Sequence, residues 1–531
     1  MGQHAPIVAA LALLAASWPG AVRAAQVQVQ LQRVEIRQAP AKPEAYQELI
    51  APLLGQAISA AQLEQLRDRL EKELLRHRTL GALRLPEQDV TNGVVEMVFE
   101  PKLLGEVRVD ASIPHRLDDA WAKQFVLVNL KPGEPIRLDR LESSLLKLND
   151  LAGVKAKSQL LPVPGTNRMD VLLKLSDTKL LNGKVNPNNL LNGLFGDAQL
   201  SAQGKANDLF GRGERLDLDL KGAGFKPDLT QRGTKATLQL PLSPTGASAT
   251  IKLNWNDYSV VGEPGVPNDA IAGNTRQLKV DLQLPLERQL AYTTVAQFNF
   301  EASRYINNFF EQPLTDRSKT VGRGSVFKQW HNDFAGKAIN NLLGAVSLGQ
   351  MNLASNALQD SQDALGPGVD GFFAKANLSF NRVQMLTRFT ELTFNVNGQK
   401  ALVNNLDLTE SLNLGFPGGV RAYPPGQSMS NDGAVAQLDL AYYFTPKFKL
   451  FAVLDAAWGR LYNEEWSGQP FSNEVALFGT GAGMRWTFRD DTSLQALLTH
   501  PLGPELENPY GVDAANQQPG WQLWAGLEWC F

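Results

Sequence analysis

The chain has 531 residues, a formal net charge of −3 and 20% charged side chains. This length leaves room for several domains, and a chain with no basic surplus is not expected to bind nucleic acid. The mean hydropathy of −0.21 is ordinary for a soluble protein. The longest apolar run covers residues 5–18, which is too short for a helix that spans a bilayer. These values exclude residence in a membrane by helices, but not by a barrel, whose strands turn half their residues away from lipid.

The first 24 residues have the pattern of a secretory signal peptide. An apolar core over residues 7–18 is followed by a helix-breaking Pro-Gly pair, and Val22-Arg23-Ala24 forms a small-residue cleavage site. The segment before the core departs from the pattern, since it holds His4 but no Lys or Arg. The sequence therefore predicts a signal peptide over residues 1–24 and a mature protein in the bacterial envelope.

Catalytic and metal-binding patterns are not found in the sequence. Cys530 is the single cysteine, so the chain cannot form an internal disulfide. The histidines are scattered, and no Cys-x-x-Cys pair accompanies them, so we expect no metal site and no cofactor. His331 and His500 are available for a Ser/His/Asp set, but no GxSxG-like stretch accompanies them and no P-loop pattern is present. We therefore expect a protein that is not an enzyme.

Residues 25–103 are predicted to form a small α+β module with the order β-α-α-β-β. A strand over residues 26–37 is followed by two helices, the second of which begins with the capping box Ser59-x-x-Gln62. Strands near residues 82–85 and 94–100 complete the module. The second helix carries one apolar stripe that would cover the sheet, formed by Leu63, Leu66, Leu70 and Leu74.

The same order recurs over residues 104–178. A strand over residues 105–110 and a helix over residues 115–128 are followed by a second helix with leucines on one face, and strands near residues 155–161 and 169–175 end the copy. Each copy has about 75 residues, a size that buries only a modest core. On this pattern alone, two generic α+β domains remain the alternative.

From residue 179 to residue 531 helical periodicity gives way to segments in which apolar and polar residues alternate. One face of these segments is rich in leucine, whereas the other carries charges such as Asp217 and Asp439, which would be costly in a dry core. Roughly 16 such segments, at about 22 residues per strand and turn, predict an all-β transmembrane barrel of antiparallel strands. A soluble β-sandwich is the alternative. The clearest examples cover residues 214–220, 235–242, 278–286 and 434–444.

Residues 406–432 break this alternation. The segment is rich in glycine and proline, most of all over residues 415–426. A long connection without regular structure is usually either functional or disordered. Taken alone, Arg421 within it reads as a solvated loop residue.

The chain ends with a strand that alternates over its whole length. Its apolar face carries Trp521, Leu523, Ala525, Leu527, Trp529 and Phe531. A terminal aromatic residue on such a strand marks a bacterial outer-membrane barrel, in which one face meets lipid and the other meets the lumen. We interpret Trp529 and Phe531 as the signal for assembly by the barrel-assembly machinery.

Four short motifs connect these regions to a known family. Leu85-Pro86-Glu87-Gln88 is similar to an LPxQ stretch, and Asn207–Glu214 is similar to a turn between early barrel strands. Val420-Arg421-Ala422-Tyr423 resembles the VRG[YF] motif at the tip of a loop folded into the barrel, and Phe451-x-x-x-Asp455 resembles a barrel-wall motif. The two modules resemble POTRA domains. The chain thus resembles the two-partner secretion transporters, the haemolysin- and filamentous-haemagglutinin-type exporters of the outer-membrane assembly superfamily.

The resemblance implies that Arg421 of the loop pairs with Asp455 of the wall. An arginine inside a lumen needs an anionic partner, and a bidentate contact to a carboxylate would supply it. The register agrees, because Phe451 and Asp455 face inward if Leu454 faces lipid. Ala422 departs from the glycine of the family motif, and alanine tolerates positive φ poorly. We therefore expect the backbone at the loop tip to differ slightly from that of relatives.

The resemblance also implies the function. Such a protein would be an outer-membrane pore that exports an unfolded, β-rich secreted partner protein from the periplasm to the cell surface. Its POTRA modules would lie in the periplasm and recognise the partner, and outer-membrane lipid would surround the barrel. An insertase that assembles other outer-membrane proteins is the alternative, although that branch usually carries more POTRA copies. A passive porin would lack the periplasmic modules.

Relatives commonly begin with a helix that plugs the pore. Here the first predicted strand starts within a few residues of Ala24, which leaves no room for such a helix. We therefore expect the loop over residues 406–432, held by Arg421, to close the resting pore.

Overall fold

The computed structural model describes residues 28–90, 92–190, 198–223, 231–259, 270–310, 312–353, 355–467, 472–503 and 520–531. The predicted signal peptide, residues 1–24, lies outside these ranges. In the described residues, no helix combines the length and apolar character needed to cross a membrane. The chain forms two compact units. One holds the described residues up to 113 with 123–145 and 156–174, and the other holds residues 114–122, 146–155 and 175–531.

The first α+β module contains a three-stranded sheet and a two-stranded ribbon. In the sheet, β5 lies between a parallel β2 and an antiparallel β4, and the ribbon pairs β1 with β3. The elements are β1 (Gln28–Gln30), β2 (Arg33–Arg37), α1 (Glu44–Ile50), a short 3₁₀ helix η2 (Ala51–Leu53), β3 (Ala57–Ser59), α2 (Ala60–Arg76), β4 (Gly81–Arg84) and β5 (Val94–Pro101).

The prediction of one continuous strand over residues 26–37 is wrong for the described part, because the chain changes from the ribbon to the sheet near Leu31. Leu31 is fully buried, and its amide donates to the Gln56 carbonyl at 2.9 Å. The next amide, that of Gln32, donates to the Gly93 carbonyl at 2.8 Å. These two bonds bend the chain, so β1 pairs with β3 whereas β2 pairs with β5.

The capping box predicted at the start of α2 is present. The Ser59 amide donates to Gln62 Oε1 at 2.8 Å, and the Gln62 amide donates to Ser59 Oγ at 3.4 Å. The leucine stripe of α2 is buried, as expected for an amphipathic helix on a sheet. It packs in one core with Val95, Met97 and Phe99 of β5.

The second module has the predicted order and a three-stranded sheet, β6-β8-β7, in which β6 and β8 are parallel. The helix predicted from residue 115 starts later, because Asp118 Oδ1 accepts the Trp121 amide at 2.7 Å in the manner of an N-cap. The elements are β6 (Leu103–Val109), α3 (Asp119–Leu127), α4 (Leu138–Asn149), β7 (Val154–Pro162) and β8 (Arg168–Asp177).

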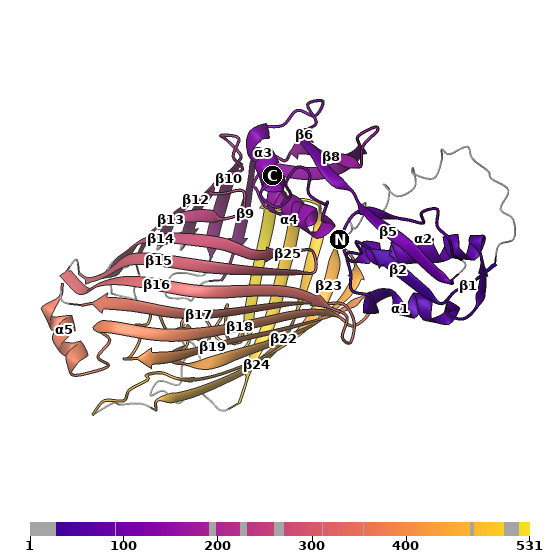
Figure 1. Ribbon diagram of the computed structural model, residues 1–531. Coiled ribbons are helices and arrows are strands. Elements are labelled where there is room, and N and C mark those ends of the chain that lie inside the picture. Colours follow the sequence, from indigo (N-terminus) through magenta and orange to yellow (C-terminus); the bar gives the residue numbers. More distant parts are fainter. Residues whose placement is uncertain are drawn as a thin grey trace. The chain divides into compact units, whose positions relative to one another are not determined.

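Sixteen strands of the described residues form a closed antiparallel barrel (Figure 1), which confirms the predicted fold class. Strands adjacent in the barrel are adjacent in sequence, and β26 closes the barrel on β9. One short helix, α5 (Ala357–Ala364), lies in the connection between β17 and β18. The strands are β9 (Leu181–Asn188), β10 (Gln199–Asn207), β11 (Arg215–Ala223), β12 (Gln231–Pro241), β13 (Ser248–Ser259), β14 (Ile271–Arg288), β15 (Tyr292–Phe309), β16 (Gln312–Asn332), β17 (Ala338–Asn352), β18 (Gly371–Met385), β19 (Thr390–Val403), β22 (Asp432–Thr445), β23 (Phe448–Arg460), β24 (Glu474–Arg489), β25 (Thr492–Leu502) and β26 (Gln522–Cys530).

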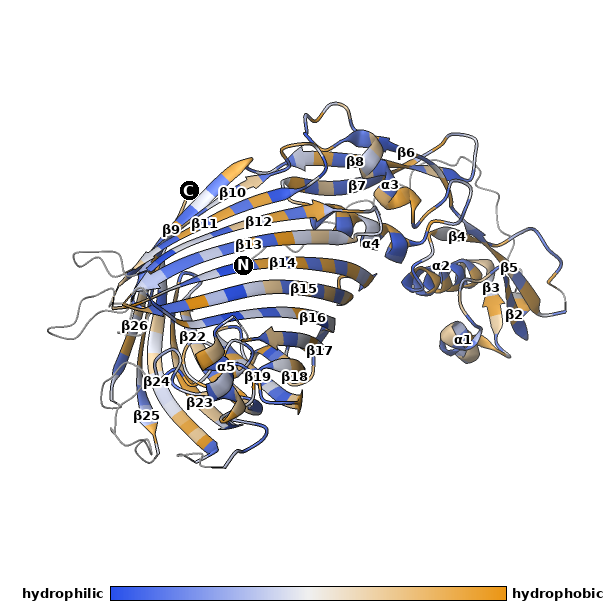
Figure 2. Ribbon diagram, turned by 90° about the vertical axis from the view of Figure 1, so that its left-hand side faces the viewer, coloured by the Kyte–Doolittle hydropathy of each residue, from blue (hydrophilic) through white to orange (hydrophobic). Residues whose placement is uncertain are grey.

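Apolar and polar residues alternate along the barrel strands (Figure 2), because successive side chains of a strand point to opposite faces. In β23, Leu450 and Leu454 are 43% and 53% exposed, whereas Asp455 is 1% exposed. In β11, Leu216 and Leu218 are exposed and Asp217 is buried. The apolar face is therefore the outer one, and the polar face lines the lumen, as the sequence predicted.

The connections differ in length between the two ends of the barrel. At the end where β9 begins, turns such as residues 289–291 and 446–447 are short. At the other end most connections are longer, such as residues 404–431 and the connection that includes α5, whereas the link between β15 and β16 is short. This asymmetry is typical of outer-membrane barrels, which have short periplasmic turns and longer extracellular loops.

Candidate functional site

The connection between β19 and β22, residues 404–431, folds into the barrel, and we call it the inward loop. It is slightly wider than the segment predicted to lack regular structure, and it contains a small ribbon of β20 (Leu412–Asn413) and β21 (Met429–Ser430). Its tip is buried: Val420, Ala422 and Tyr423 are 0%, 2% and 3% exposed. The motif residues of the loop therefore face protein rather than solvent.

Arg421, at the tip of the inward loop, is shared by two carboxylates of the barrel wall. Its Nε and Nη2 donate to Asp455 at 2.9 and 2.6 Å, and its backbone amide donates to Asp455 Oδ2 at 2.9 Å. Its Nη1 and Nη2 donate to Asp439 at 3.1 and 2.5 Å. Both contacts are bidentate, which is the geometry that a planar guanidinium favours.

The register of the wall places both carboxylates on the lumen side. Asp439 of β22 lies opposite Val453 of β23, so Asp439 and Asp455 are diagonal neighbours on one face. The contact between Arg421 and Asp455 that the motifs implied is present. Asp439 was missed as a second partner, because alternation placed it on the inner face but no motif marked it.

Apolar packing fixes the tip beside this charge cluster. Val420, Ala422 and Tyr423 pack on Val435, Ala457 and Leu477 of the wall. A Cβ added at Gly479 of β24 would lie 2.7 Å from Ala422 Cβ, so this glycine permits the close approach of the loop. The backbone at Ala422 lies outside the positive-φ region, and the methyl group in place of the family's glycine causes no backbone strain there.

Two strands at the end of the chain also hold the tip. Trp524 of β26 donates from Nε1 to the Arg421 carbonyl at 2.7 Å, and Thr499 of β25 donates to the same oxygen at 3.0 Å. The Trp524 ring stacks on Phe416 of the loop with centroids 4.4 Å apart. Phe451, predicted as part of the wall motif, packs against this aromatic cluster. Trp524 alternates with the apolar residues Leu523 and Ala525 and so falls on the inner face of β26, but no motif connected it to the loop.

The ion pairs between Arg421 and the two wall carboxylates can hold the loop in place. Removing the arginine would leave Asp455 buried without a cation, which is costly in a medium that excludes water. Within the described residues, no three His, Cys, Asp or Glu side chains are grouped so that they could hold a metal ion. The ion pairs of Arg421 with Asp439 and Asp455 therefore attach the loop tip to the barrel wall.

Comparison with known proteins identifies the family. The profile of the family described as haemolysin secretion/activation protein ShlB/FhaC/HecB matches residues 167–486, which is more than half of the chain. The chain belongs to this family. It is an outer-membrane transporter of the two-partner secretion type, which acts with a secreted partner protein, and its POTRA modules lie in the periplasm.

Individual relatives agree with this assignment at low sequence identity. The transporter is 22% identical over 480 residues to the heme/hemopexin transporter protein HuxB of Haemophilus influenzae, an alignment that covers 86% of this chain and 80% of the relative. Its fold is similar to that of CdiB from Escherichia coli, with a TM-score of 0.74 and 16% identity over 97% of this chain and 93% of that chain. BamA from Haemophilus ducreyi, lacking POTRA domains 1–3, has a TM-score of 0.52 and 12% identity over 95% of this chain and 100% of that chain.

The last residues of the transporter lie where the last barrel strand, β26, pairs with the first, β9. The amide of Phe531 donates to the Gly183 carbonyl at 2.9 Å, and the Gly183 amide donates back to the Phe531 carbonyl at 3.1 Å. The rings of Trp529 and Phe531 contact each other and are about half exposed on the outer face. Their role as an assembly signal stays a prediction.

The two remaining motifs of the transporter make hydrogen bonds within the fold. In the first module, the side-chain amide of Gln88 exchanges two hydrogen bonds of 2.6 Å with the backbone of Glu96, and so extends the pairing of β5 beyond β4. In the turn between β10 and β11, Asp208 Oδ1 accepts the Gly213 amide at 2.7 Å. Burial raises the pKa of Asp208 above its ordinary value, because the charged form is poorly solvated there.

Proposed function

We propose that the transporter passes an unfolded, β-rich partner protein through its barrel, and that the inward loop narrows the lumen until its tip leaves the wall. The observation that carries this proposal is the buried contact of Arg421 with Asp455 and Asp439. The loop enters a space that a polypeptide in transit needs, and its tip is attached by bonds that can break without unfolding a strand. The buried aromatic contact of Trp524 with Phe416 adds to this attachment.

In the proposed path, the POTRA modules would capture the partner in an extended form. We assign residues 1–24 to a signal peptide, 25–103 and 104–178 to the two modules, and 179–531 to the barrel. In the first module β2 and β4 flank β5, so each presents an outer edge that an extended segment can pair with. The transport would be driven by folding of the partner at the cell surface, where its apolar area is removed from water. The protein itself would catalyse no chemical reaction.

For assembly, we propose that Trp529 and Phe531 are read by the barrel-assembly machinery, and that the apolar face of β26 meets outer-membrane lipid. Leu527 lies on this face and is 36% exposed. A lysine there should cost about 2–4 kcal/mol at mid-membrane depth, so Leu527→Lys should reduce the amount of assembled, heat-modifiable barrel. The control is Gln522→Lys on the lumen side of the same strand. Equal assembly of the two variants and the wild type would contradict the assigned faces.

An insertase is the second candidate, and the likeness to BamA is its basis. That likeness concerns the fold alone, since the identity is 12%. The matching family profile favours the transporter instead.

The test is to delete the gene in its bacterium and compare the proteins of the cell surface and medium before and after, by mass spectrometry. We expect one large protein to disappear, and the wild-type gene to restore it. If the surface proteins stay unchanged while many outer-membrane barrels decline, the insertase is correct and the export function is wrong.

A further inference from the structure

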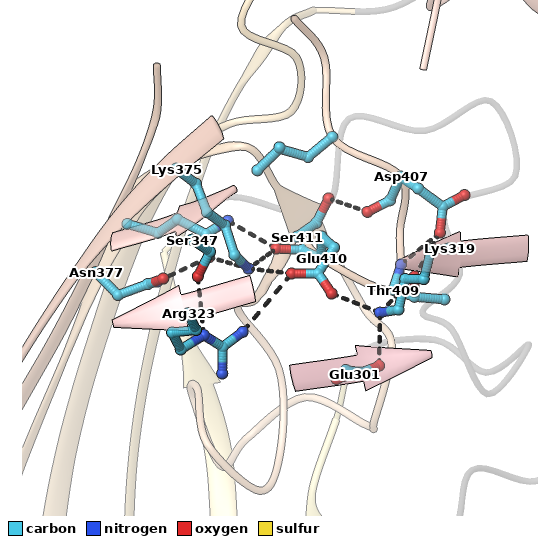
Figure 3. Close-up of polar contacts among 12 residues, drawn as sticks. Glu301, Lys319, Arg323, Ser347, Lys375, Asn377, Asp407, Thr409, Glu410 and Ser411 are labelled. Carbon is cyan, nitrogen blue, oxygen red and sulfur yellow. Dashed lines mark hydrogen bonds and ion pairs between the residues drawn. The ribbon is translucent and has the colours of Figure 1, made fainter. Parts of the chain in front are cut away.

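Figure 3 shows a second charge cluster, in the first limb of the inward loop, which we define as residues 404–411. Its centre is Glu410, whose side chain is 3% exposed. The charged residues around it come from the barrel wall: Lys319 and Arg323 of β16 and Lys375 of β18. No motif or alternation singled out Glu410, because it lies in the segment that the sequence pattern left without structure.

The contacts of Glu410 are direct and involve both of its oxygens. Lys319 Nζ lies 2.5 Å from Oε1, and Lys375 Nζ lies 2.8 Å from Oε2. Lys375 Nζ also donates to the Glu410 carbonyl at 2.5 Å. Arg323 is more distant, with Nη2 at 3.8 Å from Oε2. The loop is thus bound to the wall through the side chain and the backbone of one residue.

The turn that presents Glu410 is itself held in shape. Asp407 accepts the Thr409 amide at 2.9 Å through Oδ1, and its carbonyl accepts the Glu410 amide at 2.8 Å. Arg317 of β16 donates to Asp407 Oδ2 at 2.6 Å. The turn therefore holds the Glu410 carboxylate in place independently of the lysines. This lowers the entropy cost of forming the ion pairs.

The two lysines differ in the carboxylate contacts that each would keep without Glu410. Lys319 also contacts Glu301 of β15 at 3.2 Å, so it would retain a carboxylate from the wall. Among the described residues, the carboxylate paired with Lys375 is that of Glu410, and its remaining wall contact is Gln399 Oε1 at 3.2 Å. The Lys375 side chain is 6% exposed. While the loop is in place, loss of the Glu410 charge would leave this buried ammonium without a counter-charge, which is strongly unfavourable.

We infer that Glu410 is a second anchor of the inward loop, independent of Arg421. Glu410 is held by the strands that precede the loop, β16 and β18, whereas Arg421 is held by β22, β23, β25 and β26, which follow it. The two anchors share no residue, so their contributions should add. This inference rests on the proposed role of the loop as a constriction. On this inference, Glu410 holds the loop in the position that narrows the lumen.

The test measures single-channel openings of the full-length transporter in planar bilayers. Glu410→Gln keeps the shape of the side chain but removes its charge, and we expect the open probability to rise about tenfold or more, as a change of 1.4 kcal/mol would produce. The matched control is Glu474→Gln, an exposed glutamate at the start of β24. Heat-modifiable migration shows that each variant forms an assembled barrel.

Combined variants separate an anchor from a general loss of stability. In a Lys375→Met background, Glu410→Gln should have a smaller effect, because the lysine that loses its partner is gone. In an Arg421→Ala background, Glu410→Gln should multiply the open probability by the same factor as in the wild type. If Glu410→Gln does not assemble, Lys375→Met alone should still raise the open probability above that of the control.

Two results would overturn the inference. If Arg421→Ala opens the channel while Glu410→Gln and Lys375→Met match the control, Glu410 is not an anchor and the constriction by the loop stands. If Glu410→Gln has the same effect with and without Lys375, the pairing is wrong. A channel that none of the variants opens would instead reject the proposed constriction itself.

Discussion

The inward loop is fixed to the barrel in two places that are built with opposite charges. At the tip, one loop cation, Arg421, is held by two wall carboxylates, whereas in the first limb one loop carboxylate, Glu410, is held by two wall lysines. Apolar groups of the wall such as Val435 and Leu477 surround the tip. Polar groups such as Thr409 and Gln399 surround Glu410. The tip should therefore be sensitive to shape as well as to charge, and the first limb mainly to charge.

Removal of the tip cation is expected to have the largest effect. Arg421→Ala leaves Asp455 and Asp439 without their shared partner, and breaking such a buried pair costs about 3–5 kcal/mol. We expect the barrel to assemble and the single-channel conductance to rise. We expect the amount of exported partner at the cell surface to fall, because a loop tip without its anchor no longer has a fixed position in the lumen that the partner crosses. Conductance is measured in planar bilayers, and export by the surface comparison described above.

The matched control for this variant is Arg489→Ala, which removes an exposed arginine at the end of β24. It should leave both conductance and export at the wild-type level. Wild-type conductance in Arg421→Ala would contradict the role of the tip as an anchor.

A change of shape at the tip should have a smaller effect. Gly479→Ala places a methyl group 2.7 Å from Ala422 Cβ and 2.8 Å from Val420 Cγ1, and overpacking of this kind typically costs about 1–3 kcal/mol. We expect more frequent openings without any change in charge. Gly344→Ala in β17 is the control, because a Cβ there meets no atom within 4 Å. If both variants behave alike, the fit between Gly479 and the tip does not matter.

The smallest effect is expected from Trp524→Phe. This change removes the hydrogen bond to the Arg421 carbonyl and keeps an aromatic ring to stack on Phe416. A net loss of about 1 kcal/mol is expected, because Thr499 still donates to the same oxygen. A modest rise in open probability would agree with this ranking, whereas a larger effect than that of Arg421→Ala would show that the aromatic contact is the main attachment.

The sequence predicted the barrel well because lipid on one side and water on the other impose a period of two on every strand. It also brought Arg421 and Asp455 together, since both belong to motifs of the family. It did not predict the path of the loop between them. Glu410 could not be assigned a role, because its partners, Lys319 and Lys375, lie far away in the chain and are chosen by where the loop runs.

Asp439 was missed as a partner because the sequence does not give the path of the loop. Alternation placed it on the inner face of β22, but several inward side chains fulfil that condition, and only the position of Arg421 selects among them. The prediction of one continuous strand in the first module failed for a similar reason. The bend at Leu31 depends on hydrogen bonds to Gln56 and Gly93, which lie in other elements, so no pattern within residues 26–37 could reveal it.

The contact between Trp524 and the loop has a mechanical consequence. Trp524 belongs to β26, which joins β9 at the paired positions Gly526 with Asn188, Trp529 with Val185 and Cys530 with Lys184. A pull on the loop tip is thus transmitted to the strand that closes the circumference of the barrel. If the loop tip leaves the wall as proposed, the hydrogen bond and the ring contact of Trp524 with the loop break, and the strand that closes the barrel loses its support from the loop.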